Sequence, residues 1–416
     1  MPGRMKESGI EWTGLVPENW TLFRLKDYFS FEKGKNAALY TQDYIAEHSG
    51  EYPVYSGQTE NEGVMGKISS FDYDVDECLF TTTVGAKVMS PRILRGRFSL
   101  SQNCLIMKQT KKCSNLFIYF ALHPLFAYEK SLIPSYMQPS LRVLDLKKYM
   151  LFAPSYEEQK IIASFLKEKC GHIDDAIKQS RASVDDYKKM RKTIIAKAVT
   201  KGIKPERKMK DSGIEWVEEI PIEWESINPK ALFSQRKEKA KPGERQLTAS
   251  QQFGIVYQDE YMEKTGNKIV TVEKDFDILK HVEAGDFVIS MRSFQGGLEY
   301  STKGGSISSA YVMLIPNHEL VYPRYYRWLL KSSVYINALQ STTNMVRDGQ
   351  AMRYSNFAKV RLFAVPIDEQ KEIADYLDKK CDEIDKLIEQ KELLIEELEN
   401  YKKSLIFEYV TGKKEV

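Results

Sequence analysis

Polar and basic residues gather in clusters in both halves of this 416-residue chain. Amide and guanidinium side chains can form paired hydrogen bonds with DNA base edges, whereas Lys, Arg and hydroxyl groups suit phosphate oxygens. The clusters therefore predict a surface that contacts duplex DNA. In the first half the candidates are Ser56, Gln58, Thr59, Asn61, Lys87, Arg92, Tyr136, Gln138 and Arg142. In the second half they are Arg292, Ser293, Gln295, Lys303, Asn344, Arg347, Gln350, Arg353 and Tyr354.

A cluster is stronger evidence than any one of its members. Each candidate taken alone could be an ordinary polar residue on the surface. Arg292 and Gln295 could instead stabilise the turn at Gly296 and Gly297. The prediction therefore concerns contact loops, not individual base contacts.

Catalytic motifs are missing from the sequence. No phosphate-binding G-x-x-x-x-G-K-[ST] loop is present, no G-x-G-x-x-G follows a strand, and no [N/D]-P-P-[Y/F] tetrapeptide occurs. The five His residues are scattered, without metal-ligand spacing. We therefore expect no catalytic residue and no metal site, and a chain that recognises rather than reacts. A nuclease or methyltransferase with an unrecognised site is the enzymatic alternative.

The composition excludes some classes of protein. The formal net charge is +3 and 42% of the residues are hydrophobic, which is enough apolar material for real cores. Five Cys without a C-x-x-C pair favour a reduced, cytoplasmic compartment over a disulfide framework. No stretch is long and apolar enough to cross a membrane, and the N-terminal residues lack the apolar core of a signal peptide, so we expect no membrane partner.

One long stretch must position the clusters. Between Pro366 and Gly412 there is no Pro or Gly, and apolar residues recur at alternating steps of four and three. This spacing predicts a long helix that packs against another helix, as in a coiled coil. The apolar seam comprises Leu377, Cys381, Ile384, Ile388, Ile395, Leu398 and Leu405, with breaks at Lys391 and Lys402.

The same stretch occurs earlier in the chain. Gln159 matches Gln370 at a separation of 211 residues, and the other matches within this stretch keep that separation. The first seam comprises Leu166, Cys170, Ile173, Ile177, Val184, Tyr187 and Ile194, with breaks at Ser180 and Arg191. Since a chance helix would not repeat its own breaks, the chain is a tandem duplication. Each copy ends in a helix of roughly 40 residues, about 60 Å long.

Charged residues and a glycine in these helices allow further expectations. The carboxylates of Glu158, Glu369, Asp174 and Asp385 should form a solvated face or salt bridges between helices. Gly171 puts the local stability of the first helix in doubt. A capping box at Ser155 and a stop at Gly202 should bound the first helix.

A second repeated segment precedes each globular middle. S-G-I-E-W and P-x-x-W occur twice, so that Trp12 matches Trp216 and Trp20 matches Trp224, both at a separation of 204 residues. We expect these turns to dock the chain onto the long helices, with a nearly circular arrangement in which each helix end meets one Trp segment. The alternative is that the tryptophans are simply core residues.

The two middles share an order of elements but little sequence. Both alternate like sheet strands and then show helical spacing, at 114–123 in the first and 323–336 in the second. Residues 141–152 are expected to return to strand. The predicted fold class is α+β, a pseudo-two-fold tandem repeat of two globular mixed α/β domains separated by two long antiparallel helices. The predicted segments are 1–153, 154–202, 203–365 and 366–416.

Such a duplication suits duplex DNA, which has two-fold axes of its own. Two helices of about 60 Å span between one and two turns of DNA, a turn being roughly 34–36 Å. We expect the helices to fix the spacing between two half-sites, one for each middle. Because the middles differ in sequence, the half-sites should differ too.

These motifs resemble the DNA-specificity (S) subunit of Type I restriction-modification systems. D-E-Q-K…C-D-E-I-D…V-T-G-K and its first copy resemble the two conserved spacer regions of that family. The S-G-I-E-W segments resemble those that precede each target-recognition domain. Y-P-V-Y-S-G-Q-T-E-N-E-G-V-M-G and R-D-G-Q-A-M-R-Y-S-N-F resemble stretches within such domains. The resemblance covers nearly the whole chain.

The resemblance implies partners and cofactors. Such a subunit reads a bipartite, asymmetric DNA target and binds two methyltransferase (modification) subunits and two restriction subunits. It directs DNA methylation at adenine N6, with S-adenosylmethionine on the modification subunits and ATP and magnesium on the restriction subunits. No cofactor is expected on this chain. The main alternative is a non-enzymatic tandem coiled-coil adaptor that binds protein rather than DNA.

Overall fold

The chain folds into two compact units. The computed structural model describes residues 4–58, 61–85, 87–269, 271–272, 278–290, 293–342 and 353–416. Unit 1 comprises Met1–Arg181 and Glu392–Val416, and unit 2 comprises Ala182–Lys391. Each long helix thus gives one half to each unit. The predicted four-segment division of the chain stays a prediction.

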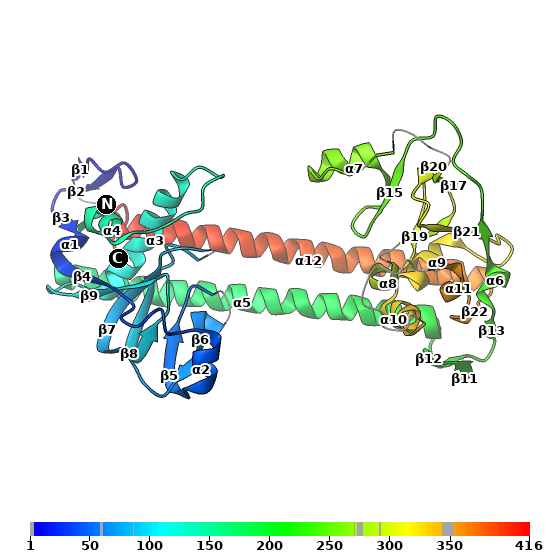
Figure 1. The fold of residues 1–416 in the computed structure, drawn as a ribbon, viewed down its shortest axis with the longest axis horizontal. Helices are drawn as coiled ribbons and strands as arrows, with labels where there is room; N and C mark the ends of the chain where they lie inside the picture. Colours follow the sequence, from blue (N-terminus) through cyan, green and yellow to red (C-terminus); the bar gives the residue numbers. More distant parts are fainter. Residues whose placement is uncertain are drawn as a thin grey trace. The chain divides into compact units, whose positions relative to one another are not determined.

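Unit 1 is built on a six-stranded sheet (Figure 1). Its pairings are antiparallel except for the parallel pair β5–β8. The strand order is β4 (Phe29–Lys33), β9 (Cys104–Gln109), β7 (Tyr73–Thr82), β8 (Arg92–Leu100), β5 (Ser49–Tyr55) and β6 (Val64–Ile68). The central strands bury apolar residues on both faces, because α3 packs on one side and a second apolar cluster fills the other.

Two small strand pairs and several helices complete unit 1. The pairs are β1 (Met5–Glu7) with β2 (Leu15–Pro17), and β3 (Thr21–Arg24) with β10 (Met150–Ala153). The helices are α1 (Leu25–Tyr28), α2 (Gln42–Glu47), η1 (Asn61–Gly63), α3 (Asn115–Ser131) and α4 (Val143–Lys148).

The expectation that residues 141–152 form a strand is wrong for its larger part. The segment contains α4 and only then enters β10. The backbone N–H of Arg142 donates to the carboxylate of Asp145 at 2.9 Å, which caps the first turn of a helix. Val143 and Leu146 are also spaced for one helix face. The alternating sequence pattern predicted a strand, but the capping hydrogen bond stabilises a helix here instead.

The described residues of unit 2 form a four-stranded antiparallel sheet and four strand pairs. The sheet order is β14 (Phe233–Arg236), β21 (Val312–Pro316), β18 (Phe287–Ile289) and β19 (Glu299–Tyr300). The pairs are β11 (Met209–Ile214) with β12 (Val217–Pro221), β13 (Glu225–Ile227) with β22 (Leu362–Ala364), β15 (Leu247–Ser250) with β16 (Gly254–Tyr257), and β17 (Lys280–Val282) with β20 (Gly305–Ile307).

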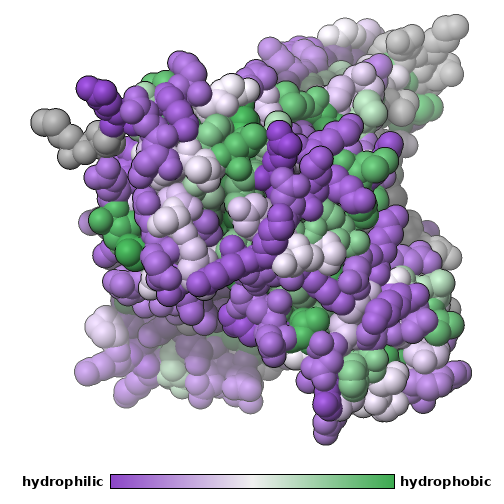
Figure 2. Space-filling model, turned by 90° about the vertical axis from the view of Figure 1, so that its left-hand side faces the viewer, coloured by the Kyte–Doolittle hydropathy of each residue, from purple (hydrophilic) through white to green (hydrophobic). Residues whose placement is uncertain are grey.

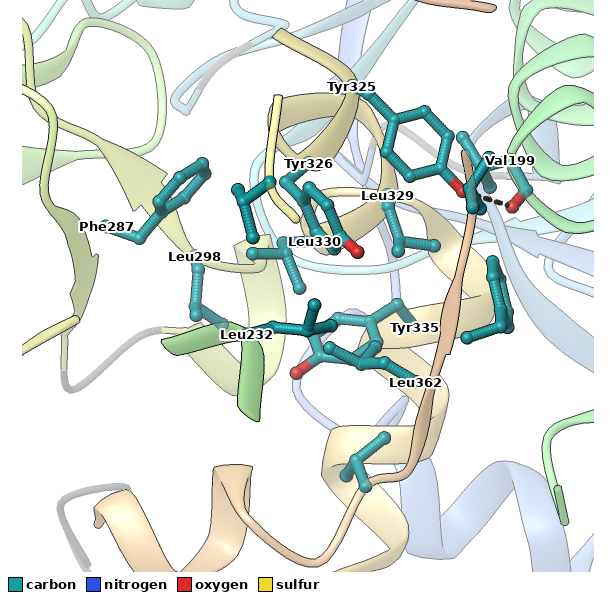
Figure 3. Close-up of a cluster of buried hydrophobic side chains, with 14 of the residues drawn as sticks. Val199, Leu232, Phe287, Leu298, Tyr325, Tyr326, Leu329, Leu330, Tyr335 and Leu362 are labelled. Carbon is teal, nitrogen blue, oxygen red and sulfur yellow. Dashed lines mark hydrogen bonds between the residues drawn. The ribbon is translucent and has the colours of Figure 1, made fainter. Parts of the chain in front are cut away.

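The helices of unit 2 surround an aromatic core. Figure 3 shows Tyr325 and Tyr326 in this core, and the Tyr325 hydroxyl donates to the Val199 carbonyl at 2.9 Å. The single helix expected over 323–336 is instead two helices, because the Ser332 hydroxyl accepts from the Tyr335 N–H and starts a second one. The short helices are α6 (Pro229–Leu232), α7 (Gln258–Thr265), α8 (Ser293–Gly296), α9 (Pro323–Leu330), α10 (Ser333–Ser341) and α11 (Tyr354–Phe357).

The two long helices are α5 (Tyr156–Lys201) and α12 (Ile367–Val410), which run side by side within each unit (Figure 1). They are antiparallel, since Phe165 packs on Tyr409 in unit 1 and Val184 clusters with Ile388 in unit 2. The predicted seam residues are buried or partly buried. The expected α+β fold with two long antiparallel helices is confirmed.

Local expectations for α5 are largely confirmed. The Ser155 hydroxyl accepts from the Glu158 N–H at 3.3 Å, so the helix start is capped as predicted. Gly202 ends the helix with φ +72°, a left-handed conformation that favours glycine. The doubt about Gly171 is not supported, because the helix continues through it.

One break in each apolar seam is an ion-pair position. Lys402 of α12 contacts Asp174 of α5 at 2.6 Å in unit 1, and Arg191 of α5 contacts Asp385 of α12 at 2.9 Å in unit 2. The two pairs are related by the 211-residue repeat. For these aspartates the prediction of salt bridges between helices is confirmed, and the repeated seam defect has a physical reason.

The same buried glutamine joins each unit to the start of its long helix. Gln159 accepts from the Ser114 N–H at 3.0 Å and donates to the Pro154 carbonyl at 3.0 Å. Gln370 accepts from the Tyr322 N–H at 2.7 Å. Each glutamine thus ties the N-terminal end of a neighbouring helix, α3 or α9, to the long helix.

The tryptophan segments dock on the long helices as expected, and they are also core residues. Trp20 and Trp224 are both buried. The Trp20 indole donates to Glu158 at 3.4 Å, and the Trp224 indole donates to Glu369 at 3.0 Å. The expectation of a solvated face or a helix-helix bridge is therefore wrong for Glu369, which is only 4% exposed.

The predicted circular arrangement is confirmed within unit 1. A Cβ on Gly412, just after α12, would lie 3.0 Å from the Trp20 ring. The Lys413 ammonium group donates to the Thr13 carbonyl at 2.6 Å. The end of the second long helix therefore meets the first Trp segment in space.

Candidate nucleic-acid interface

Three loops that carry the candidates of the first half converge in unit 1. Val84 and Ser140 form an isolated antiparallel bridge, and the Leu141 N–H donates to the Thr83 carbonyl at 2.8 Å. A Cβ on Gly57 would lie 3.6 Å from the Val84 carbonyl oxygen. The loops after β5, after β7 and between α3 and α4 are therefore neighbours, as a shared contact surface requires.

In the loop after β5, two of the polar candidates form hydrogen bonds within the loop. The Ser56 N–H donates to the Gly63 carbonyl at 2.7 Å, and the Gln58 side-chain amide donates to the Val64 carbonyl at 2.6 Å. Asn61 is exposed and has φ +46°, the left-handed region in which Asn is favoured. Ser56 and Gln58 therefore shape the loop, and Asn61 faces solvent.

The arginines of β8 are paired with carboxylates. Arg92 donates to the Glu62 carbonyl and forms a 3.7 Å ion pair with the Glu62 carboxylate. Arg95 is paired with Glu77, and Arg97 lies 2.9 Å from Asp74. These carboxylates compensate the charges of the arginines. Arg92, through its bonds to Glu62, stabilises the first loop.

The third loop presents its candidates to solvent. Tyr136 is 86% exposed, and Gln138 and Arg142 are exposed as well. Lys87, on the adjacent loop, is also exposed, and its carbonyl accepts from the Thr82 hydroxyl. These side chains are better placed for a ligand than those of the first loop.

Sequence reasoning missed a set of cations beside this loop. α1 packs against α4, and Arg24 pairs with Met150 across β3 and β10. This brings together exposed basic residues from two segments that are far apart in the sequence: Arg24, Lys26, Lys147 and Lys148. No motif marks them, so only the strand register could have grouped them.

Hydrophobic side chains lie among these cations. Leu144 is 65% exposed on α4 and Leu22 is 43% exposed on β3. Figure 2 faces this end of unit 1 and shows small groups of hydrophobic side chains within a mostly hydrophilic surface. The surface can therefore make both ionic and apolar contacts.

In unit 2 several candidates are structural. Ser293 is fully buried, and its hydroxyl accepts from the Ser290 N–H at 2.8 Å. The Tyr354 hydroxyl donates to the Phe233 carbonyl at 3.1 Å, and burial raises its pKa. These contacts stabilise the fold of unit 2 and leave neither hydroxyl facing a ligand.

The other described candidates of unit 2 are nearer the surface. Lys303 lies 2.5 Å from Glu260 and over the Tyr257 ring at 4.5 Å, and its hydrogen bond lowers the pKa of the Glu260 carboxyl. Gln295 and Arg353 are exposed. Thr59, Arg292, Asn344, Arg347 and Gln350 lie outside the described residues.

The titratable groups do not suggest proton transfer at this surface. Burial raises the pKa of the Cys78, Cys104 and Cys113 thiols to about 12, so these thiols stay protonated. Burial lowers the pKa of His123 to about 4. Among the described residues no cluster of His, Cys, Asp and Glu could hold a metal ion, and no described helix could span a membrane.

Comparisons with known proteins point to one family. Residues 17–182 match the family model described as the Type I restriction modification DNA specificity domain. A putative type I specificity subunit of Mycoplasma pneumoniae is 33% identical over 149 residues, which cover 35% of this chain and 38% of that protein. This chain spans 38% to 60% of the length of five such relatives.

Longer matches extend along the chain at lower identity. The Type I restriction enzyme MjaVIII specificity subunit of Methanocaldococcus jannaschii is 23% identical, with 98% of this chain and 96% of that protein covered. A solved chain described under complex assembly and conformational transition of the type I R-M system has TM-score 0.67 and 13% identity, with 96% of this chain and 99% of that chain covered. The predicted resemblance is therefore confirmed, and the solved chain supports the fold.

Proposed function

We propose that this chain, whose residues 17–182 match the Type I restriction modification DNA specificity domain, is the non-catalytic subunit that selects the DNA target of such a complex. Unit 1 and unit 2 each contact one half-site. The half-sites differ in sequence, because the loops of the two units differ. The unread spacer between them is set by α5 and α12.

The observation that carries this proposal is the repeated junction between each globular unit and the long helices. Trp20 with Glu158 and Trp224 with Glu369 make the same contact, although the loops around them share little sequence. Two different DNA half-sites require the same junctions with the long helices in both units but different contact loops. The convergent loops of unit 1 supply a surface of suitable chemistry.

The remaining partners follow from the same proposal. Two modification subunits and two restriction subunits assemble on this chain, and double-stranded DNA is its ligand. S-adenosylmethionine belongs to the modification subunits, and ATP and magnesium belong to the restriction subunits. The chain itself acts in the cytoplasm and holds no cofactor.

Selection from a random pool of duplexes tests the proposal. The full chain is incubated with its methyltransferase partner, and the bound DNA is sequenced. We expect a split motif with two unlike parts and a constant gap. Enrichment of no sequence, with or without the partner, would favour the protein-binding adaptor instead, and methylation or cleavage by the chain alone would favour an enzyme.

Matched insertions test the role of the helices. Seven residues are inserted into both α5 and α12 at positions related by the 211-residue repeat. A heptad preserves the packing of the seam and adds about 10 Å to each helix. We expect the selected gap to widen by about three base pairs, a turn of 34–36 Å holding 10–10.5 base pairs, with both half-sites unchanged. An unchanged gap contradicts the spacing role.

A further inference from the structure

The turn between α3 and α4 exposes two large apolar side chains at its tip. Tyr136 is 86% exposed and Met137 is 53% exposed. Leaving such side chains in water forgoes the free energy that their burial would supply. A short turn that keeps two of them outward therefore suggests that they are buried in a complex.

The turn is fixed at both ends. The Met137 N–H donates to the Pro134 carbonyl at 2.9 Å, which closes a tight turn with Tyr136 at its third position. Leu141 is buried, and its N–H is bonded to the Thr83 carbonyl. A second proline, Pro139, restricts the backbone between tip and anchor. The tip can therefore enter a partner with little loss of conformational entropy.

Cations stand at the foot of this turn. Arg142, Lys147 and Lys148 are exposed, and among the described residues their side chains have no ion pair. This differs from β8, where Arg92 and Arg97 are paired with carboxylates. Uncompensated cations beside an apolar tip are what a protein needs to hold phosphates while inserting a side chain between bases.

We propose that Tyr136 and Met137 form a wedge that enters between two stacked base pairs of the DNA bound by unit 1. The inference rests on the proposed function. The tyrosine ring stacks on an exposed base face, and the flexible methionine fills the opened step. Unstacking is easiest at pyrimidine–purine steps, so the DNA at the contact carries a TA or CA/TG step.

Site-specific fluorescence tests the wedge in the full chain with its methyltransferase partner. The selected duplex carries 2-aminopurine at successive positions of the half-site of unit 1. We expect fluorescence to rise on binding at one step, and the double variant Tyr136→Ser with Met137→Ser to abolish the rise. Affinity should fall about tenfold or more, since one stacked base contributes about 1–3 kcal/mol.

A matched control separates the wedge from general apolar contact. Leu144→Ser removes a 65%-exposed apolar side chain on α4, next to the same cations. We expect it to leave the fluorescence rise in place. Replacing the flexible step with an A-tract should weaken binding of the unmodified chain and leave the double variant nearly unaffected. Thermal unfolding of every variant should be unchanged, because the substituted side chains are exposed.

Several outcomes would overturn the wedge. If a split motif is selected but no position gains fluorescence and the double variant binds as tightly, the wedge is wrong and the proposed function stands. If the double variant weakens only assembly with the methyltransferase, the tip is a protein contact. If no sequence is selected at all, the proposed function fails and the wedge with it.

Discussion

Units 1 and 2 contact the long helices through matching Trp and Glu residues, but the surroundings of the two glutamates differ. In unit 2 the carboxylate of Glu369 accepts from Trp224 and also pairs with Arg207, whose side chain is 9% exposed. In unit 1 the half-buried Glu158 accepts from Trp20. The duplicated contact therefore persisted while its charge environment changed.

The difference has a source in the sequence. Arg207 lies in the linker after α5, and the 204-residue separation of the two Trp segments places Gly3 at the matching position of the first copy. Glycine carries no charge, so the ion pair could not be duplicated. The comparison teaches that hydrogen bonds to the tryptophans define the junction, whereas the buried ion pair is an addition in unit 2.

Removing the two glutamates should give unequal losses. Glu369→Ala removes the buried partner of the Arg207 guanidinium and leaves it only the exposed Glu223, which should cost up to about 3–5 kcal/mol. Glu158→Ala removes one hydrogen bond to a partly buried acceptor and should cost about 1 kcal/mol. Hydrogen–deuterium exchange in urea, followed separately in peptides of each unit, measures both. Glu223→Ala, which removes the exposed partner of Arg207, is the control, and equal losses at 158 and 369 would contradict the comparison.

Acid should weaken unit 1 through His123. In the unfolded state the pKa of this imidazole is about 6.5. In the folded state burial, and to a smaller extent the positive charge of Lys402, lowers the pKa to about 4. Stability contributed by this group is therefore complete above pH 6.5 and falls as pH drops toward 4, by up to about 3 kcal/mol. Exchange in unit 1 peptides across that window measures the loss.

His123→Gln should flatten this dependence in unit 1 and leave unit 2 unchanged. The groups that face the imidazole are Lys402, Asp174 and Lys130, so the same profile is measured at high salt to screen them. A pH profile that survives the substitution would assign the loss to other carboxylates.

Replacing the buried glutamines Gln370 and Gln159 by alanine should destabilise the two units to different extents, with smaller effects than the loss of Glu369. Gln370→Ala leaves the Tyr322 N–H and the carbonyls of Leu320 and Val365 without their bonds. Gln159→Ala leaves fewer groups, so we expect about 2–3 kcal/mol in unit 2 and about 1–2 kcal/mol in unit 1. Unfolding midpoints of each unit decide the order, and glutamate at either position is the shape-matched control.

The smallest effects should come from the repeated ion pairs between helices. Asp174 with Lys402 and Asp385 with Arg191 are substantially exposed, so each should contribute about 0.2–1 kcal/mol. Double-mutant cycles to alanine at both sites measure the coupling. Near-equal values that vanish in 1 M salt are expected, and a value above 2 kcal/mol at one site would break the symmetry.

Periodic features were predictable, and short contacts were not. The seams of α5 and α12 followed from spacing alone, since burial of one face sets the positions of Leu166 and Leu377. The cap at Asp145, which turns an expected strand into α4, depends on one hydrogen bond. Local patterns of six residues are too weak to outweigh such a bond.

The candidate site was only partly predictable for a related reason. The exposed loop with Tyr136 and Arg142 was identified from its composition, because prolines and polar residues mark turns. The burial of Ser293 could not be foreseen, since it depends on how α8 packs. Nor could the cations of α1 and α4, which become neighbours only through the pairing of β3 with β10.

The contact between Lys413 and Thr13 has a consequence for synthesis on the ribosome. Unit 2 is one continuous segment, whereas unit 1 needs Glu392–Val416, which is translated after all of unit 2. Domains fold as their residues emerge, at about 5–20 residues per second. Unit 2 can therefore fold first. The apolar seam of α5 in unit 1 stays exposed until Glu392–Val416 has been synthesised and packs against it.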